Sequence, residues 1–343
     1  MGKTSIVKKA AGLLREVGHT VVYVSAETST LDAFTESLMT EIRREARLRD
    51  RISKWETELA GEAKLSVAGN GFKLSGKLKK NGVAVETDFF ALCGEAAAKL
   101  GHVSVVICID EISVLANALH SNTPGAASEF LHSLRRSRQS LKNVSIVLAC
   151  SVGLHHAVKD LTPLSDLAEV RVAELSCGDA EVLAQRLLVG CFGLFAGIEL
   201  LAREIALRCS YIPYYIHRLI FDIEQNWESP PASTDIGGMV YQSIAENAWG
   251  TDHYYDRIHA YYGRDAASVV ACLDAVCAAS SCSMDELAAA LPPKQKKRPL
   301  QRHELGLLMR TMQRDHYLKV VENGYAINTD LLRLIWSITR ERR

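Results

Sequence analysis

The sequence predicts an α/β fold for its first half, a parallel β-sheet covered by helices. Short apolar runs alternate with helix-like segments through about Leu175. The runs are apolar on both faces, which is typical of strands in parallel sheets that helices cover on each side. After Leu175 the pattern becomes helical, so we expect a helical region followed by a smaller C-terminal domain.

The elements of the first half are predicted from periodicity and from stop signals. Residues 3–17 carry apolar side chains at helical spacing, and Gly18 ends that helix. The later helices are expected near 31–49, 88–101 and 126–141, and the strands near 19–28, 103–109, 144–151 and 168–175. Residues 64–82 alternate apolar and polar residues around Gly-Asn-Gly, which predicts an inserted β-hairpin.

The C-terminal part predicts a winged helix-turn-helix over residues 263–343. Two long helical segments, 178–190 and 197–225, come first, and a proline-containing linker follows them. Three short helices, a strand–turn–strand around Asn323-Gly324 and a closing helix then complete the pattern.

The overall composition is that of an ordinary globular protein. Of 343 residues, 48% are hydrophobic and 23% are charged, and the formal net charge is zero. The net charge therefore gives no overall electrostatic attraction that would indicate a nucleic-acid or membrane partner. No signal peptide and no apolar run of membrane-spanning length is present, which predicts a cytoplasmic protein. The nine cysteines lack C-x-x-C spacing, so we expect reduced, buried, structural thiols.

The first residues, Gly2, Lys3, Thr4 and Ser5, have the pattern that ends a phosphate-binding loop. Such a loop needs a lysine for the β- and γ-phosphates, a hydroxyl for Mg²⁺, and a helix N-terminus whose N–H groups face the anion. Gly-Lys-Thr directly before a predicted helix meets these needs. The alternative is a chance tetrapeptide at a helix start.

A second motif follows the predicted strand at 103–109. Asp110 and Glu111 stand at its C-terminal end, the edge at which parallel α/β sheets bind ligands. One acid there holds Mg²⁺, and the next polarises an attacking water. An acidic helix N-cap is the alternative, and it explains one acid better than it explains the pair. The two motifs together predict a site for ATP and Mg²⁺.

The following strand, at 144–151, ends in Ser151, a candidate sensor of the γ-phosphate. A serine that begins a helix is an equally good interpretation of this residue.

The order "GKTS", "VVICIDE", "ACSVGL" and "SYIPYYI" resembles the AAA+-like P-loop ATPases of the archaeal ATPase and STAND group. The resemblance implies an αβα core, a helical lid and a C-terminal winged helix. It implies that Lys3 grips phosphate and that Thr4 and Asp110 bind Mg²⁺. It also implies that Glu111 is the catalytic base, that Ser151 is the sensor, and that Pro213 lies near the base of the nucleotide.

This resemblance sets the expected domain boundaries. The core spans 1–175, the lid 176–228, a linker or helical connector 229–262, and the winged helix 263–343. The sequence departs from the family pattern at Tyr211, where a strict G-x-P motif has glycine. The three arginines Arg135, Arg136 and Arg138 are either a solvated basic face or a source of an arginine finger for a neighbouring subunit in a homo-oligomer.

The start of the chain departs more strongly from the family pattern. A complete loop reads G-x-x-x-x-G-K-[ST], and its first glycine would lie four positions before Met1. The strand that leads into the loop would also precede Met1. We therefore expect a core that lacks its first strand, and we expect Met1 to be an internal methionine of a longer natural chain.

The C-terminal residues are locally basic. From Pro292 to Arg343 there are twelve Lys and Arg against five Asp and Glu. DNA would bind such a face through counterion release, and a protein partner is the alternative. The side chains expected to face a groove are Gln301, Arg302, Arg310 and Arg314. The inserted hairpin supplies a weaker basic surface at Lys73, Lys77, Lys79 and Lys80.

The sequence thus predicts an ATPase that couples ATP binding and hydrolysis to a winged helix that binds DNA or protein. The rival prediction is a non-catalytic DNA-binding or adaptor protein that retains an eroded ATPase core. A plain winged-helix regulator is a third reading, but it leaves the α/β half unexplained.

Overall fold

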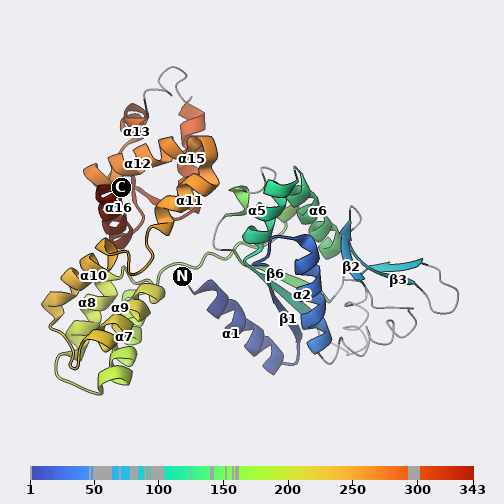
Figure 1. Ribbon diagram of the computed structural model, residues 1–343, viewed down its shortest axis with the longest axis horizontal. Helices are drawn as coiled ribbons and strands as arrows, with labels where there is room; N and C mark the ends of the chain where they lie inside the picture. Colours follow the sequence, from blue (N-terminus) through green and yellow to red (C-terminus); the bar gives the residue numbers. More distant parts are fainter. Residues whose placement is uncertain are drawn as a thin grey trace. The chain divides into compact units, whose positions relative to one another are not determined.

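The computed structural model describes most of the chain, and its described residues form two compact units, 2–170 and 171–343. Figure 1 shows the elements of both units along the sequence. The described residues are 2–45, 48, 64–68, 71–77, 84–88, 91, 93, 104–123, 125–139, 143–150, 153–156, 158, 162–292 and 302–343.

A three-stranded parallel sheet in the order β1-β5-β6 lies at the centre of the N-terminal unit (Figure 1). Its strands are β1 (Thr20–Ser25), β5 (Val105–Asp110) and β6 (Val144–Leu148). Every residue of β5 is buried, because β5 has a strand on each side. β6 alternates half-buried and exposed residues, and among the described residues it pairs with β5 alone. The predicted parallel α/β arrangement is confirmed.

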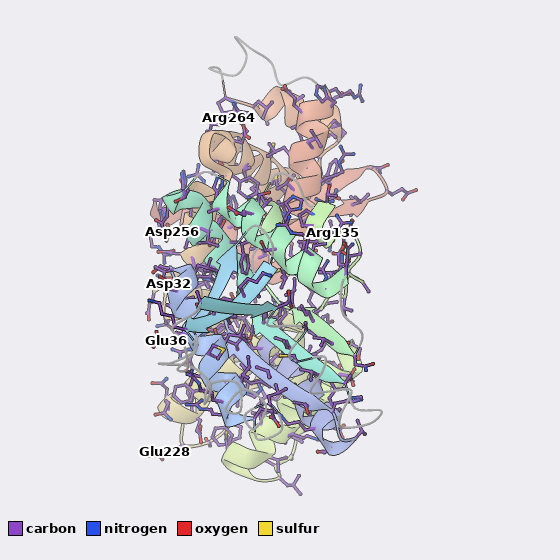
Figure 2. All side chains as sticks on the ribbon, turned by 90° about the vertical axis from the view of Figure 1, so that its right-hand side faces the viewer. Asp32, Glu36, Arg135, Glu228, Asp256 and Arg264 are labelled. Carbon is purple, nitrogen blue, oxygen red and sulfur yellow. The ribbon has the colours of Figure 1, made fainter. Side chains whose placement is uncertain are left out.

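Helices cover both faces of this sheet. They are α1 (Lys3–Glu16), α2 (Leu31–Arg44), α5 (Ile112–Asn122) and α6 (Ala126–Gln139). α1 packs on the face formed by Val21, Val106 and Cys108. The other three helices pack on the opposite face, with Phe34 and Phe130 in that core. The polar side of α2 faces outward, and its acids Asp32 and Glu36 project from the surface (Figure 2).

The inserted segment forms a three-stranded antiparallel sheet rather than a single hairpin. β2 (Lys64–Ala68) and β3 (Gly71–Lys77) pair as predicted, and β4 (Ala84–Asp88) adds a third strand. Phe72 of β3 is fully buried, with its ring centroid 6.0 Å from that of Phe130 on α6. This contact fixes the inserted sheet to the main core.

The predicted strand at 168–175 is wrong, because these residues lie in no strand. The amide of Leu175 donates instead to the carbonyl of Tyr211 at 3.0 Å, and Asn328 donates to the carboxylate of Glu174 at 3.3 Å. The end of the segment therefore bonds to the C-terminal unit, where no described strand pairs with it. The predicted helix at 88–101 lies almost wholly outside the described residues.

The C-terminal unit begins with five helices: α7 (Cys177–Phe192), α8 (Ile198–Arg208), α9 (Pro213–Asn226), α10 (Ile236–Ala245) and α11 (His253–Tyr262). It continues with α12 (Ala266–Ala279), α13 (Met284–Ala290), α15 (Arg302–Arg314), β7 (Leu318–Val321), β8 (Gly324–Ile327) and α16 (Asp330–Arg342). The three predicted short helices, the strand–turn–strand and the closing helix are all present.

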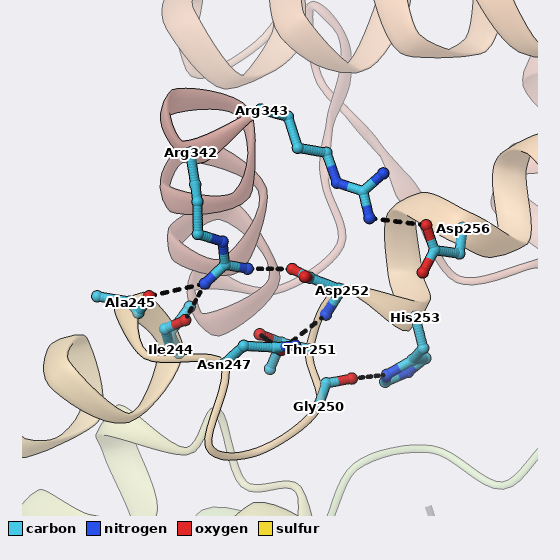
Figure 3. A network of polar contacts seen from close by, with 10 residues as sticks. All are labelled: Ile244, Ala245, Asn247, Gly250, Thr251, Asp252, His253, Asp256, Arg342 and Arg343. Atoms are coloured by element: carbon cyan, nitrogen blue, oxygen red, sulfur yellow. Dashed lines mark hydrogen bonds and ion pairs between the residues drawn. The ribbon is translucent and has the colours of Figure 1, made fainter.

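The last helix, α16, joins the two apolar cores of this unit. Leu331, Ile335 and Ile338 pack into the core of α7–α10, whereas Leu332 and Trp336 pack into the core of α11–α15. The end of α16 is also bonded to α10 and to the start of α11 (Figure 3). The two cores are therefore parts of one compact body.

All nine thiols are free, as predicted, but their burial varies. Five are buried, and Cys177 is exposed at the first residue of α7, so the prediction that the thiols are buried is wrong for that residue. Across the described part of the chain, we find no helix with the length and apolar character that crossing a membrane requires.

Candidate functional site

Asp110 occupies the C-terminal end of β5, with only 2% of its surface exposed. Its Oδ2 accepts a hydrogen bond from the phenol of Tyr23 at 2.7 Å, and its Oδ1 accepts one from the amide of Glu111 at 3.0 Å. Burial, assisted by the contact with Asp110, raises the pKa of Tyr23, so the phenol keeps its proton and acts as the donor. A buried carboxylate is thus held in one orientation at the carboxyl edge of the sheet.

Glu111 has a backbone conformation that is rare for a residue with a side chain. Its φ is 53°, and it is the N-cap of α5. The chain turns sharply here, because the amide of Ile112 bonds to the carbonyl of Ala149 after β6 at 3.1 Å. A left-handed conformation of this kind costs about 1–3 kcal/mol and is found preferentially at functional sites. Glu111 directly follows Asp110, so its backbone lies at the same edge of the sheet.

The first turn of α1 begins directly after Gly2, whose φ is 68°. Lys3 and Thr4 are half-buried, and Ser5 is exposed. The amides of this first turn have no partner within the helix, as in every α-helix. The left-handed glycine suits the end of a loop that enters a helix.

Two contacts show the direction of α1 relative to the sheet. Arg15, near the end of α1, donates to the carbonyl of Val21 at 2.8 Å. Lys8, two turns earlier, has its Nζ 5.3 Å from the ring centroid of Tyr23, two residues later in β1. α1 therefore runs antiparallel to β1, and its first turn points to the edge where β5 ends in Asp110.

The third sequence motif lies partly outside the described residues. Ser151 and residue 152 are not among them, so the sensor assignment remains a prediction. The residues just before it are described. β6 ends at Leu148, and the amide of Ala149 donates to the carbonyl of Ile109 at 2.9 Å. The chain therefore leaves β6 beside the end of β5.

The arginines of α6 differ in their surroundings. Arg135, labelled in Figure 2, donates to the carbonyl of Thr162 at 2.8 Å. Arg138 donates to the carbonyl of Pro163 at 2.9 Å and pairs with Asp166. These contacts fasten the 3₁₀ turn at 162–164 to α6. Arg136 is exposed, and it contacts Ser133 of its own helix at 3.5 Å.

Pro213 is the first residue of α9, in the C-terminal unit, where its fixed φ suits a helix start. The two residues before Ile212 have positive φ, 49° at Ser210 and 60° at Tyr211. The backbone at Tyr211 therefore adopts the conformation that the glycine of a G-x-P motif adopts easily. The departure from the motif changes the side chain and keeps a glycine-like backbone.

A cavity of about 280 Å³ lies beside β1, between α1 and α2. Its charged lining includes Lys8, Arg15, Glu41 and Arg44, and Tyr23 also lines it. None of the predicted nucleotide residues line this cavity. It lies along the side of β1 that pairs with no strand among the described residues, so it is not the predicted site at the end of β5.

The residue that sequence reasoning missed is Tyr23. Within VVYVS it reads as one more β-sheet former in an apolar run. Its bond to Asp110 depends on β1 and β5 being neighbours in a parallel register that pairs Tyr23 with Cys108. A polar atom within an apolar strand was the only available signal.

No protein-family model and no curated protein sequence matches this chain. The Walker-type ATPase of Pyrococcus abyssi is similar in structure, with a TM-score of 0.55 and 14% identity over 97% of this chain and 95% of that chain.

Two other solved structures also match, with lower scores. A RuvB variant of Thermotoga maritima has a TM-score of 0.33 and 16% identity over 68% of this chain and 71% of that one. The ORC2 protein of Aeropyrum pernix has a TM-score of 0.31 and 11% identity over 99% and 85%. At 14% identity the likeness to the Pyrococcus protein is one of fold. The chain shares its fold with this Walker-type ATPase.

Proposed function

We propose that this protein binds ATP with Mg²⁺ at the carboxyl edge of its parallel sheet and hydrolyses the γ-phosphate. The observation that carries the proposal is the location of Asp110 and Glu111 at the edge to which the first turn of α1 points. Ligands of parallel α/β sheets bind at this edge, and a helix N-terminus there favours phosphate.

The side chains available for a metal fit magnesium. A buried carboxylate at Asp110 and a half-buried hydroxyl at Thr4 are hard oxygen donors, the type that Mg²⁺ prefers. When bound, Mg²⁺ would neutralise charge on the β- and γ-phosphates. Asp110 and Thr4 would hold the ion, and two hydrogen bonds already orient Asp110.

The other predicted site residues would bind the phosphates and activate the attacking water. Lys3 pairs with the phosphate oxygens, and the amides of Gly2 and Ser5 help to enclose them. Glu111 accepts a proton from the attacking water, and Ser151 hydrogen-bonds the γ-phosphate. Pro213, at the start of α9, is the residue proposed to lie near the base of the nucleotide.

The proposed domains are an ATPase core over 1–175, a lid over 176–228, a connector over 229–262 and a winged helix over 263–343. The core would then bind nucleotide at the carboxyl edge of its sheet, and α7–α9 would act as the lid. Because α16 packs into both apolar cores of the C-terminal unit, lid and winged helix would move together. The proposal is that ATP binding at the core changes the activity of this C-terminal unit.

The site is tested by measuring ATP binding calorimetrically and phosphate release enzymatically. Lys3→Ala should weaken ATP binding about tenfold or more, because a charge-assisted contact is lost. Lys9→Ala, which removes an exposed lysine from the same helix, should bind ATP like the unchanged chain. Glu111→Gln should retain binding and lose about 10²–10⁴-fold in hydrolysis. Equal ATP binding by Lys3→Ala and the unchanged chain rejects this site.

DNA is the partner that the charge pattern favours for the winged helix. On α15, the exposed residues His303, Leu307, Arg310 and Arg314 form one stripe at helical spacing. Lys319 and Val320 of β7 are exposed as well. Arg302 lies 3.6 Å from Asp285, and Gln301 is outside the described residues. Arg310 and Arg314 are therefore the strongest candidates for phosphate or base contacts.

Fluorescence polarisation with duplex DNA tests this part. Arg310→Ala and Arg314→Ala should each weaken DNA binding. Each should also reduce the slope of log affinity against log salt concentration by about one. Arg186→Ala, which removes an exposed arginine from α7, should leave DNA binding unchanged. If the unchanged chain binds no DNA, a protein partner replaces DNA in the proposal. DNA binding without any ATP binding would indicate the non-catalytic scaffold.

A further inference from the structure

The bond between Tyr23 and Asp110 connects strand β1 to the proposed magnesium ligand. The two residues are 87 positions apart and lie on neighbouring parallel strands. The phenol oxygen is 2.7 Å from Oδ2 of Asp110. Because the carboxylate is almost fully buried, its orientation depends on the few donors that reach it.

Each oxygen of the Asp110 carboxylate has one hydrogen-bond donor. Tyr23 bonds to Oδ2 and the amide of Glu111 bonds to Oδ1, so each oxygen accepts one hydrogen bond. A carboxylate oxygen has two acceptor positions, and each oxygen therefore keeps one for another ligand. Rotation about the side-chain bonds would break both contacts, so this rotation is restricted.

The chemistry of the donor matters as well. An arginine or lysine at this place would orient the carboxylate but would also cancel its charge. A phenol is neutral and leaves the full negative charge available for a cation. Lys8 of α1 lies over the Tyr23 ring, 5.3 Å from its centroid, and restrains the ring from the side of α1.

We propose that Tyr23 is a positioning residue for the magnesium ligand Asp110, fixing the carboxylate in the orientation that receives the ion. This inference rests on the proposed function, since it requires that Asp110 bind the metal that accompanies the nucleotide. Tyr23 does not touch nucleotide or metal. Its effect passes through the hydrogen bond to Asp110.

Outer donors to metal ligands are commonly worth 10- to 100-fold in metal affinity. Tyr23→Phe keeps the ring over α1 and removes only the phenol. Mg²⁺ should increase the affinity for ADP, and one Mg²⁺ concentration gives half of that increase. We expect Tyr23→Phe to raise this concentration by about tenfold or more. The affinity for ADP in EDTA should remain unchanged, because that state contains no metal.

The experiment is calorimetric titration of the full chain with ADP, first in EDTA and then at increasing Mg²⁺. A matched control is Tyr262→Phe, which removes a phenol–carboxylate bond of 2.6 Å to Asp315 in the C-terminal unit. It should lose stability as Tyr23→Phe does and keep the Mg²⁺ dependence of the unchanged chain. Asp110→Asn should abolish the Mg²⁺ dependence, and adding Tyr23→Phe to it should change nothing further.

The outcomes separate the inference from the proposed function. If Tyr23→Phe follows the Mg²⁺ curve of the unchanged chain while Asp110→Asn does not, the site stands and the role of Tyr23 is rejected. If the unchanged chain gains no ADP affinity with Mg²⁺, or Asp110→Asn responds normally, the proposed site is rejected and the inference with it.

A measurement on the unchanged chain applies if Tyr23→Phe fails to fold. With ring-deuterated tyrosine and Mn²⁺ in place of Mg²⁺, electron–nuclear double resonance of the ADP complex should detect a tyrosine ring just outside the ligand sphere. The absence of any tyrosine coupling in the complex would overturn the inference.

Discussion

The hydroxyl of Ser210 accepts a hydrogen bond from the amide of Leu331 at 3.0 Å, across 121 residues of sequence. Ser210 follows α8, and Leu331 lies in the first turn of α16. The bond is buried, and it supplies a partner for an amide that the helix itself leaves unbonded. One short contact thus joins the α7–α10 core to the helix that closes the chain.

Removing that hydroxyl should destabilise the C-terminal unit. Ser210→Ala leaves a buried amide without its acceptor and should lower the free energy of unfolding by about 1–3 kcal/mol. Ser210→Gly loses the same bond but relieves the positive φ of 49°, so it should be less destabilised than Ser210→Ala. Urea unfolding followed by circular dichroism measures both variants. Equal stability of the two would contradict strain at this position.

Replacing Glu111 with glycine should increase the stability of the protein and reduce its ATPase activity. Glu111→Gly removes the side chain from a residue with φ of 53° and should raise the free energy of unfolding by about 1 kcal/mol. The proposed general base is lost in the same variant, so ATP hydrolysis should fall. Glu111→Gln loses hydrolysis and keeps the strained backbone, which makes it the control. A glycine variant less stable than the glutamine variant would argue against backbone strain.

Arg342 should contribute to stability through three contacts with the end of α10 and the start of α11. Its guanidinium donates to the carbonyls of Ile244 at 3.0 Å and Ala245 at 2.7 Å, and it pairs with Asp252 (Figure 3). Arg342→Ala should lower the free energy of unfolding by about 1–3 kcal/mol, because the last carbonyls of α10 lose charged donors.

Arg342→Lys is the informative companion variant. A lysine retains the charge but lacks the planar fork that reaches two carbonyls and a carboxylate together. It should recover only part of the loss in thermal or urea unfolding. Full recovery would show that charge alone accounts for the effect of Arg342.

Glu286 should make the stability of α13 depend on pH. Its carboxylate accepts hydrogen bonds from the amide of Ser283, at 2.7 Å, and from the hydroxyl of Ser283, at 2.8 Å, which completes a capping box. The backbone bond and then the side-chain bond lower the pKa of Glu286 below 4.5. The ionised carboxylate is therefore favoured in the folded state. Its contribution to the free energy of unfolding is present above pH 4.5 and is lost as pH falls through the lower pKa of the folded state.

Glu286→Gln tests the sign of that dependence. At neutral pH the variant should melt below the unchanged chain, because the charged acceptor is missing. Below the folded pKa the difference should become small, since the glutamate is then protonated as well. Thermal melts at several pH values measure the difference. A gap that widens on acidification would contradict this assignment.

The positions of Asp110 and Glu111 were predictable because they depend on local rules. An apolar run of strand length followed by acids places those acids at the end of a buried strand, whatever the rest of the fold is. Gly2 before a helical pattern is equally local. The boundaries of α12, residues 266–279, follow from its continuous apolar and alanine-rich composition in the same way.

The predictions that failed depend on partners. Residues 168–175 have β-branched alternation, but a strand forms only where another strand offers an edge, and Leu175 bonds to Tyr211 instead. The third strand of the inserted sheet, β4, was missed because its residues, AVETD, include two acids. Its hydrogen bonds to β3 outweigh that low propensity.

The sequence by itself determined the order of most elements, the two motifs and the basic character of the C-terminal residues, because periodicity, turn residues and charge are properties of neighbouring residues. The tertiary structure alone decided that Tyr23 meets Asp110, that Arg135 and Arg138 hold a turn, and that α16 packs into two cores. These contacts join residues far apart in the chain. Their formation depends on strand order and helix packing, which the whole core sets through the burial of apolar surface.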